Sequence, residues 1–258
     1  MEIRNVLFTN NPRYVEGKTF VPKGVMVHST GANNPKLRRY VQPDDGLLGV
    51  NNEGSDWNRA DQPLCVHAFI GKDKNGDVRC YQVLPWTTRT YHCGTGPKGS
   101  GNSTHIAFEI CEDGLTDPDY FAKIYDTAAD LCVYLCREFG LTAQDVICHS
   151  EGCALGIASN HADVMHWFPK FGKTMDDFRA EVARRMEDED MTQEKFDAMM
   201  AVYLKNLSAQ EPSDWSAEAR TWAEENGVVK GSDGAMQYKK FATKEEVAQM
   251  LYNALGGK

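Results

Sequence analysis

Alternating apolar and polar residues in the first 150 positions predict a set of short β-strands. KGVMVHST (23–30) is an apolar run that ends in polar residues, and THIAFEICED (104–113) places an apolar side chain at every second position from Ile106 to Ile110. CVHAFIGKDKNGDVRCYQVL (65–84) contains two such runs on either side of an Asn-Gly pair, which is typical of a tight hairpin turn. These segments predict at least four strands, two of them joined as a hairpin.

Helical spacing of apolar residues follows the strand segments. Residues 119–139 repeat apolar positions at helical intervals and end at Gly140, and 175–189 is a charged amphipathic segment that closes a first domain near residue 186. Between them VICH (146–149) predicts a further strand that brings His149 to its end. Because strands and helices alternate, we expect residues 1–186 to form an α/β domain, with one mixed central β-sheet flanked by helices.

The remaining residues, 187–258, carry helical patterns without strand signals. The acidic run EDED (187–190) predicts a linker, and residues 191–210 predict a helix. Residues 212–255 predict a helix, a glycine-rich loop and a second helix that begins at the capping-box pair Thr243 and Glu246. We therefore expect a second, small helical domain.

Composition and charge exclude some classes of partner. The chain has 258 residues and a formal net charge of -9, whereas nucleic-acid-binding proteins usually present a basic patch. No window holds 18 uninterrupted apolar residues, which predicts no membrane span, and the N-terminal residues do not resemble a signal peptide. The eight cysteines are expected to be free thiols in a protein made in the cytoplasm, because a chain of this length does not need disulfides.

The segment ICHSEGCALGIASNHADVMHWF (147–168) concentrates residue types that bind metals. A hydrolytic zinc site uses three protein ligands and leaves one position for water. His28 and His149, each at the end of a predicted strand, are two candidates, and the loop supplies either His161 or Asp163 as the third. Cys153 is a further alternative, because a thiolate binds zinc well.

Four segments in a fixed order resemble a known family. They are VMVHSTGAN (25–33), HAFIGKDKNGDVRCYQVLP (67–85), YHCGTGPKGSGNSTHIAFEICED (91–113) and the histidine-rich segment 147–168. Together they resemble the zinc-dependent N-acetylmuramoyl-L-alanine amidases of type 2, whose fold is shared with peptidoglycan recognition proteins. GIASNHAD followed by HWF is similar to the catalytic domains of phage and prophage endolysins. The resemblance covers roughly residues 5 to 180.

The resemblance implies a site and a reaction. His28, His149 and Asp163 match the family's zinc ligands, and Glu109 matches the glutamate that activates the hydrolytic water. Where many family members have a lysine that stabilises the oxyanion, this chain has His161. The implied cofactor is Zn²⁺, and the implied reaction is hydrolysis of the amide bond between N-acetylmuramic acid and L-alanine in bacterial peptidoglycan.

Four further residues are expected to contact the substrate. His92 matches a histidine on the wall of the family's substrate groove, and Asn102 lies just before the strand with Glu109. His67 stands near a position where some members have a tyrosine, so it either lines the pocket or packs in the interior. Trp167 either packs in its loop or forms the floor of a sugar or peptide subsite.

The C-terminal segment resembles a single S-layer-homology-like repeat, which implies cell-wall association or homo-oligomerisation. Two other functions stay open: a peptidoglycan-binding module without catalysis, and a cytoplasmic amidase that recycles soluble muropeptides. The absence of a recognisable signal peptide fits an endolysin that reaches the wall after holin-type release, and it also fits a recycling enzyme.

Overall fold

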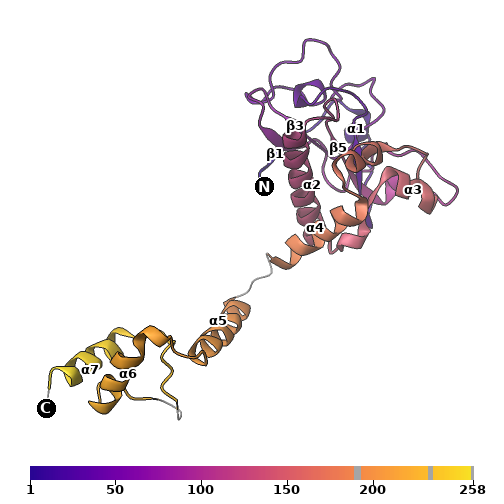
Figure 1. Ribbon diagram of the computed structural model, residues 1–258. Coiled ribbons are helices and arrows are strands. Elements are labelled where there is room, and N and C mark those ends of the chain that lie inside the picture. Colours follow the sequence, from indigo (N-terminus) through magenta and orange to yellow (C-terminus); the bar gives the residue numbers. More distant parts are fainter. Residues whose placement is uncertain (189–192, 232–234, 257–258) are drawn as a thin grey trace. The chain divides into compact units, whose positions relative to one another are not determined.

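The computed structural model describes residues 1–188, 193–231 and 235–256, and the chain divides into two compact units, Met1–Glu189 and Asp190–Lys258 (Figure 1). The strands are β1 (Ile3–Asn5), β2 (Gly24–Ser29), β3 (Ala68–Lys72), β4 (Val78–Gln82), β5 (His105–Ile110) and β6 (Val146–Cys148). The α-helices are α1 (Pro12–Glu16), α2 (Pro118–Phe139), α3 (His149–Leu155), α4 (Met175–Asp188), α5 (Gln193–Ser208), α6 (Ala217–Glu225) and α7 (Lys244–Ala254). Short 3-10 helices are η1 (Leu37–Arg39), η2 (Gly101–Ser103), η3 (Ala143–Asp145), η4 (Asp163–His166), η5 (Phe168–Phe171) and η6 (Asp214–Ser216).

The first unit is built on one six-stranded sheet with the order β1-β4-β3-β5-β2-β6. β3 and β4 pair antiparallel, and the other neighbouring strands are parallel. The hairpin turn forms because the Asp73 carboxylate accepts the backbone N–H groups of Asn75 and Asp77, while Gly76 takes the left-handed conformation with φ 92°. The predicted mixed sheet and its hairpin are confirmed.

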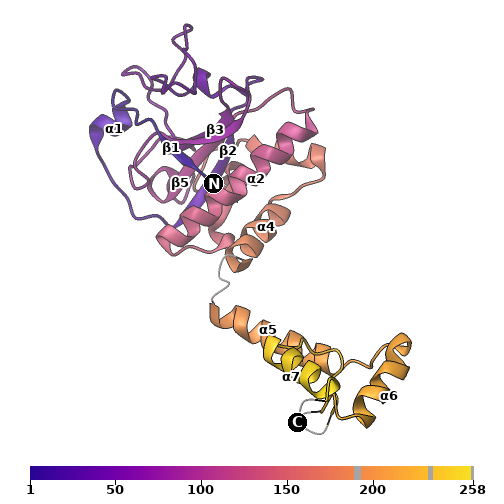
Figure 2. The ribbon, with the colours of Figure 1, turned by 90° about the vertical axis from the view of Figure 1, so that its left-hand side faces the viewer.

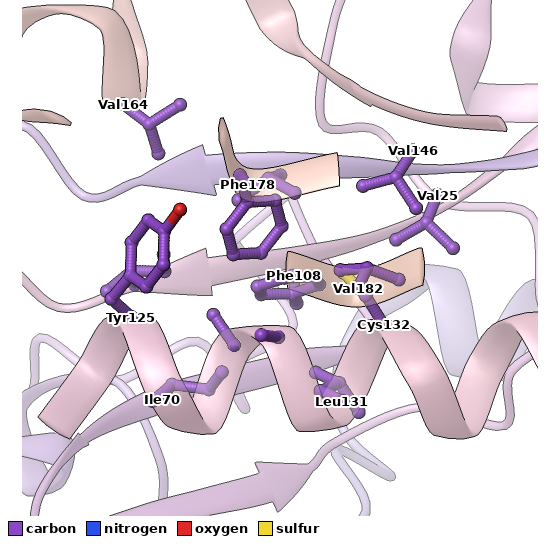
Figure 3. Close-up of a cluster of buried hydrophobic side chains, with 14 of the residues drawn as sticks. Val25, Ile70, Phe108, Tyr125, Leu131, Cys132, Val146, Val164, Phe178 and Val182 are labelled. Atoms are coloured by element: carbon purple, nitrogen blue, oxygen red, sulfur yellow. The ribbon is translucent and has the colours of Figure 1, made fainter. Parts of the chain in front are cut away.

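Helices α2 and α4 lie side by side on one face of the sheet and cover the main hydrophobic core (Figures 2 and 3). The side chain of Asp117 caps the start of α2, and Gly140 ends the helix in the left-handed conformation, as the sequence predicted. Val25, Phe108 and other alternate strand residues point into this core, and they pack against apolar side chains of both helices.

The opposite face of the sheet carries a second hydrophobic core near β3 and β4. Polar side chains lie on the same face at the ends of β2 and β5. Tyr40, Phe69 and Tyr81 form part of this second core. Met26 and Ile147 lie instead in a smaller third cluster. His28 and His149 lie on this same side of the sheet, two positions after Met26 and Ile147.

The second unit is helical, as predicted. The hydroxyl of Thr243 accepts the backbone N–H of Glu246, whose carboxylate accepts the N–H of Thr243, so the capping box is confirmed. None of the residues of α5, α6 or α7 is buried. Of the expected linker 187–190, the first two residues belong to α4 and the last two lie outside the described residues. In the described parts of the chain, no helix is long and apolar enough to cross a membrane.

Candidate functional site

The register of the parallel strands brings two polar side chains together near the carboxyl ends of two neighbouring strands, β2 and β5. His28 on β2 pairs with Glu109 on β5, so both side chains leave the sheet on the face opposite α2. Val27 pairs with Cys148 on β6, which places His149 beside His28 at the next position. β6 ends one residue earlier than the predicted strand, and His149 is the first residue of α3.

A loop after α3 returns Asp163 to these histidines. Its carboxylate Oδ2 lies 2.8 Å from Nδ1 of His28 and 2.8 Å from Nδ1 of His149, and the two Nδ1 atoms are 3.2 Å apart. Asp163 has a left-handed backbone with φ 43°, which aspartate tolerates better than most residues. The loop therefore accepts an uncommon backbone conformation at the residue that completes the cluster.

The cluster fits a zinc ion by its donor types and spacing. His28, His149 and Asp163 each offer one ligand atom, and these atoms all lie within 4.8 Å of one another. Zinc takes imidazole nitrogen and carboxylate oxygen at about 2.0–2.2 Å, so tetrahedral ligand atoms stand about 3.3 Å apart. Cys153, the alternative ligand in the sequence, is not part of the cluster.

Protonation of the cluster also favours a metal. Burial lowers the pKa of His28, although the neighbouring Asp163 carboxylate acts in the opposite direction. Burial would raise the pKa of Asp163, but its hydrogen bonds with His149 and His28 outweigh burial and lower this pKa below its usual value. A neutral imidazole and an ionised carboxylate are the forms that bind metal ions.

Glu109 faces the cluster without a partner. Its Oε2 atom is buried and has no hydrogen bond to any residue that the structure describes. Burial, together with the nearby charges of Asp163 and Glu112, raises the pKa of Glu109 well above its usual value. A carboxylate with a raised pKa beside a metal-type cluster has the properties of a general base.

His161 lies on the other side of the cluster. Its ring stacks on His149 with the centroids 5.0 Å apart, and it lines the same pocket of about 440 Å³ as the three candidate ligands, His92 and Glu109. Unlike the ligands, His161 is exposed. It is therefore accessible to a molecule that enters the pocket.

Two expected substrate contacts are wrong, because the side chains are in the interior. Trp167 has no exposed surface and packs against Tyr120 and Phe121 in the main core. His67 is also fully buried: Nε2 donates to the carbonyl of Thr88, and Nδ1 accepts the backbone N–H of Ala107. Burial lowers the pKa of His67 to about 4, which fits a neutral packing residue. For both residues the alternative of interior packing applies.

Asn102 does not contact the pocket either. It is buried, and both of its polar atoms bond to the backbone of residues 92–94. His92 does line the pocket, and its Nδ1 lies 2.9 Å from Nε2 of His28. The structure thus connects His92 and Asn102 to the ligand His28 through hydrogen bonds that the sequence did not indicate.

Sequence reasoning missed Ser159, which also lines the pocket. Its hydroxyl lies 3.3 Å from Nε2 of His149. The only signal was the position of Ser159 in the polar loop SNHAD, and many surface loops share that composition. The eight cysteines are all free, as expected, and Cys148 belongs to the main core.

A family model and several solved structures match this chain. A family model described as N-acetylmuramoyl-L-alanine amidase matches residues 18–166, which is over half the chain. The Staphylococcus aureus hydrolase AmiA, solved in complex with its ligand, is similar in fold with a TM-score of 0.53 and 19% identity, over 72% of this chain and 83% of AmiA. The PlyG catalytic domain is similar with a TM-score of 0.50 and 22% identity, over 72% of this chain and 96% of that domain. A mutant endolysin from Bacillus subtilis gives a TM-score of 0.48 and 22% identity, over 70% of this chain and 99% of the endolysin. No curated protein matches the sequence. By its family match the chain belongs to the type 2 N-acetylmuramoyl-L-alanine amidases.

Proposed function

We propose that this amidase is zinc-dependent and cleaves the amide bond between N-acetylmuramic acid and L-alanine in bacterial peptidoglycan, as an endolysin does. The observation that carries the proposal is the convergence of two histidine Nδ1 atoms and one carboxylate within 4.8 Å, facing the unpaired Glu109. His28, His149 and Asp163 would hold the zinc ion. Bound there, zinc would supply Lewis-acid polarisation of the scissile carbonyl and a lower pKa for water.

The side chains of this protein have distinct tasks in the reaction. Glu109 accepts a proton from the attacking water, for which its raised pKa and its free Oε2 atom suit it. A ring N–H of His161 donates to the carbonyl oxygen as that oxygen gains negative charge. Glu109 then passes its proton to the nitrogen of the leaving alanine, so that one carboxylate serves first as base and then as acid.

Two other functions make different demands on the site. A binding module without catalysis needs neither a complete ligand set nor a free carboxylate, and this chain has both. A recycling amidase would act on soluble muropeptides, and its preference for small substrates is open to direct measurement.

The test is the release of new L-alanine amino termini from purified Gram-positive peptidoglycan. Wild type is assayed with zinc and after chelation, beside Asp163→Ala and a control, Asp61→Ala, at an exposed position outside the pocket. We expect release by zinc-loaded wild type and by the control, and none after chelation or with Asp163→Ala. Cosedimentation with the wall but no released amino groups would identify a binding module. Faster cleavage of soluble muropeptides than of intact wall would identify a recycling enzyme.

An endolysin role also fixes the route to the wall. In this proposal the protein is made in the cytoplasm and passes to the peptidoglycan through holin-type lesions. Its expression in a Gram-positive host would then lyse cells only when a holin is co-expressed. Lysis without a holin would contradict this route.

We also propose that the second unit self-associates. The apolar residues Phe196, Met200, Tyr203 and Leu207 of α5 are spaced by four, three and four positions, which is the spacing of a coiled-coil seam. The first three are exposed, and α5 has no buried residue. A small unit in which none of the described side chains is buried gains stability when such a seam pairs with a second copy.

The mass of the full chain in solution tests this association. Light scattering during size exclusion is expected to give a multimer for wild type and a monomer for Met200→Glu combined with Tyr203→Glu. Lys205→Glu, on the opposite side of α5, is the control that should stay multimeric. A monomeric wild type would exclude self-association and leave binding to a wall polymer, through the S-layer-homology-like segment, as the role of this unit.

A further inference from the structure

The two candidate histidine ligands turn their second ring nitrogens toward His92 and toward Ser159, whose hydroxyl is hydrogen-bonded to the carbonyl of Cys93. Nε2 of His28 lies 2.9 Å from Nδ1 of His92, and Nε2 of His149 lies 3.3 Å from the hydroxyl of Ser159. A histidine that binds a metal through Nδ1 keeps its proton on Nε2 and donates it to an outer acceptor. Both ligands thus have an acceptor in place.

The hydrogen bonds around Ser159 identify it as the acceptor for His149. Its hydroxyl donates to the backbone carbonyl of Cys93 at 3.1 Å, and its backbone N–H donates to the same oxygen at 2.8 Å. The hydroxyl proton is therefore engaged, and the lone pairs of the oxygen remain for the N–H of His149. Gly94, with φ 67°, is needed beside it, because a Cβ at this position would lie 3.0 Å from the Ser159 hydroxyl.

His92 has a comparable relation to His28. The only polar contact that its ring makes within the described chain is the one with His28, since its Nε2 atom has no hydrogen-bond partner there. The two rings also meet edge to face with the centroids 5.0 Å apart. The edge-to-face ring contact and the hydrogen bond from His28 to His92 both restrain the orientation of the His28 ring.

Asn102 holds the backbone of residues 92–94, which carries His92 and the Cys93 carbonyl that binds Ser159. Its Oδ1 accepts the N–H groups of His92 at 2.8 Å and Cys93 at 3.1 Å, and its Nδ2 donates to the carbonyl of Gly94 at 3.2 Å. Asn102 lies in η2, three residues before the first residue of β5, the strand of Glu109. One buried amide thus fixes the whole loop relative to the sheet.

We propose that His92 and Ser159 are positioning residues that set the tautomer and ring orientation of His28 and His149, and that Asn102 holds both in place. This inference rests on the proposed zinc site. It gives His92 a role toward the metal ligand instead of the role toward substrate that the family resemblance implied.

Zinc affinity, measured by competition with a chromophoric chelator, separates these roles. His92→Phe keeps a ring but removes the acceptor, so we expect zinc to bind about 10–100-fold more weakly. In His92→Asn the side-chain oxygen takes the place of Nδ1, and we expect affinity within a few-fold of wild type. His105→Phe, at a histidine outside the pocket, is the matched control and should bind zinc as wild type does.

Ser159→Ala gives a second test that disturbs packing little. It should weaken zinc binding in the same direction, whereas Ser103→Ala, a serine of η2 that is bonded to Arg89, should not. Long-range proton–nitrogen NMR spectra of the zinc-loaded protein should show the Nε2–H tautomer at His28, and the Nε2 proton should exchange with water faster in His92→Phe, which lacks the acceptor.

The outcomes distinguish this inference from the proposed function. Wild type that binds no zinc would overturn both. Wild type that binds zinc and cleaves peptidoglycan, with unchanged affinity in His92→Phe and Ser159→Ala, would overturn the positioning role alone. A raised KM with unchanged zinc affinity in His92→Phe would make His92 a substrate contact.

Discussion

Replacement of Glu109 by glutamine should separate catalysis from stability. The substitution keeps the size of the side chain and removes its charge. Oε2 of Glu109 is buried without a hydrogen bond to any described residue, so its removal breaks no contact that the fold needs. The same change at Glu112, three residues along the chain, is the matched control, because Glu112 accepts the N–H of Gly31 at 3.0 Å and lies 3.0 Å from His166.

The size of each effect follows from these contacts. A general base contributes about 10²–10⁴-fold to the rate, so Glu109→Gln should lower kcat by that factor, about 2.7–5.5 kcal/mol in activation free energy. An unpaired buried polar atom costs about 1–3 kcal/mol, and more when charged. Glutamine still places a polar atom there, so we expect a gain of about 1 kcal/mol in the unfolding free energy of the zinc-free protein.

The gain should depend on pH in a defined direction. The pKa of Glu109 is higher in the folded protein than in the unfolded chain because the side chain is buried and because Asp163 and Glu112 lie near. The folded state therefore holds this proton more tightly, and the cost of the charge is absent below the unfolded pKa of about 4.3. This cost grows as the pH rises from the unfolded pKa through the folded pKa. The difference in unfolding free energy between Glu109→Gln and wild type therefore increases with pH.

Urea unfolding of the chelated proteins at several pH values, with amidase assays of the zinc-loaded proteins, measures both effects. Glu112→Gln is expected to lose stability and to keep most of its kcat. If Glu109→Gln retains more than about a tenth of wild-type kcat, Glu109 is not the base. If its zinc-free form is less stable than wild type at pH 7, the carboxylate has a partner that the structure does not reveal.

Three further outcomes test the site and the core. Trp167→Ala should lower the unfolding free energy by about 3–5 kcal/mol in urea titrations, because the indole is fully buried in the main core; a loss below 1 kcal/mol would contradict this packing. Chelation should lower the unfolding free energy of wild type by about 4 kcal/mol relative to protein with zinc at a thousand times its Kd, and Asp163→Ala should show much less difference between the two states. Hydrogen bonds from Arg184 and Arg185 lower the pKa of Glu181 to about 2, so the stability it contributes is present above about pH 4.3 and is lost toward pH 2. The difference in stability between wild type and Glu181→Gln should therefore shrink as pH falls from 5 to 2.

The sequence predicted the elements that have a regular period. Alternation in β5 and helical spacing in α2 each reflect one side of an element that faces the main core, so the order of residues carries the signal. The strand β1 and the helix α1 were not expected, because neither contains a buried residue and neither therefore carries an apolar pattern.

The expected site residues that the structure brings together differ in the same physical way from those that it does not. The expected ligands His28 and His149 sit at or next to strand ends, where register determines their neighbours. Trp167 follows the irregular segment η4, where the sequence does not say which way a side chain points, and it turned out to be in the core. Ser159 was missed because its hydrogen bond joins a loop residue to His149, the first residue of α3, and depends on tertiary structure.

The division of the sheet into two faces explains how the fold supports an unfavourable site. The site keeps an unpaired buried carboxylate at Glu109 and a left-handed backbone at Asp163, and both features cost stability. The face of β2 and β5 that packs against α2 and α4 carries the apolar side chains Val25, Val27, Ile106, Phe108 and Ile110. Because side chains alternate along a strand, Val27 and Phe108 stabilise the same backbone that presents His28 and Glu109 to the pocket. A change in the core that shifts β2 against β5 by one residue would turn His28 toward the apolar layer and away from Glu109, so the register that stabilises the fold is also the register that assembles the site.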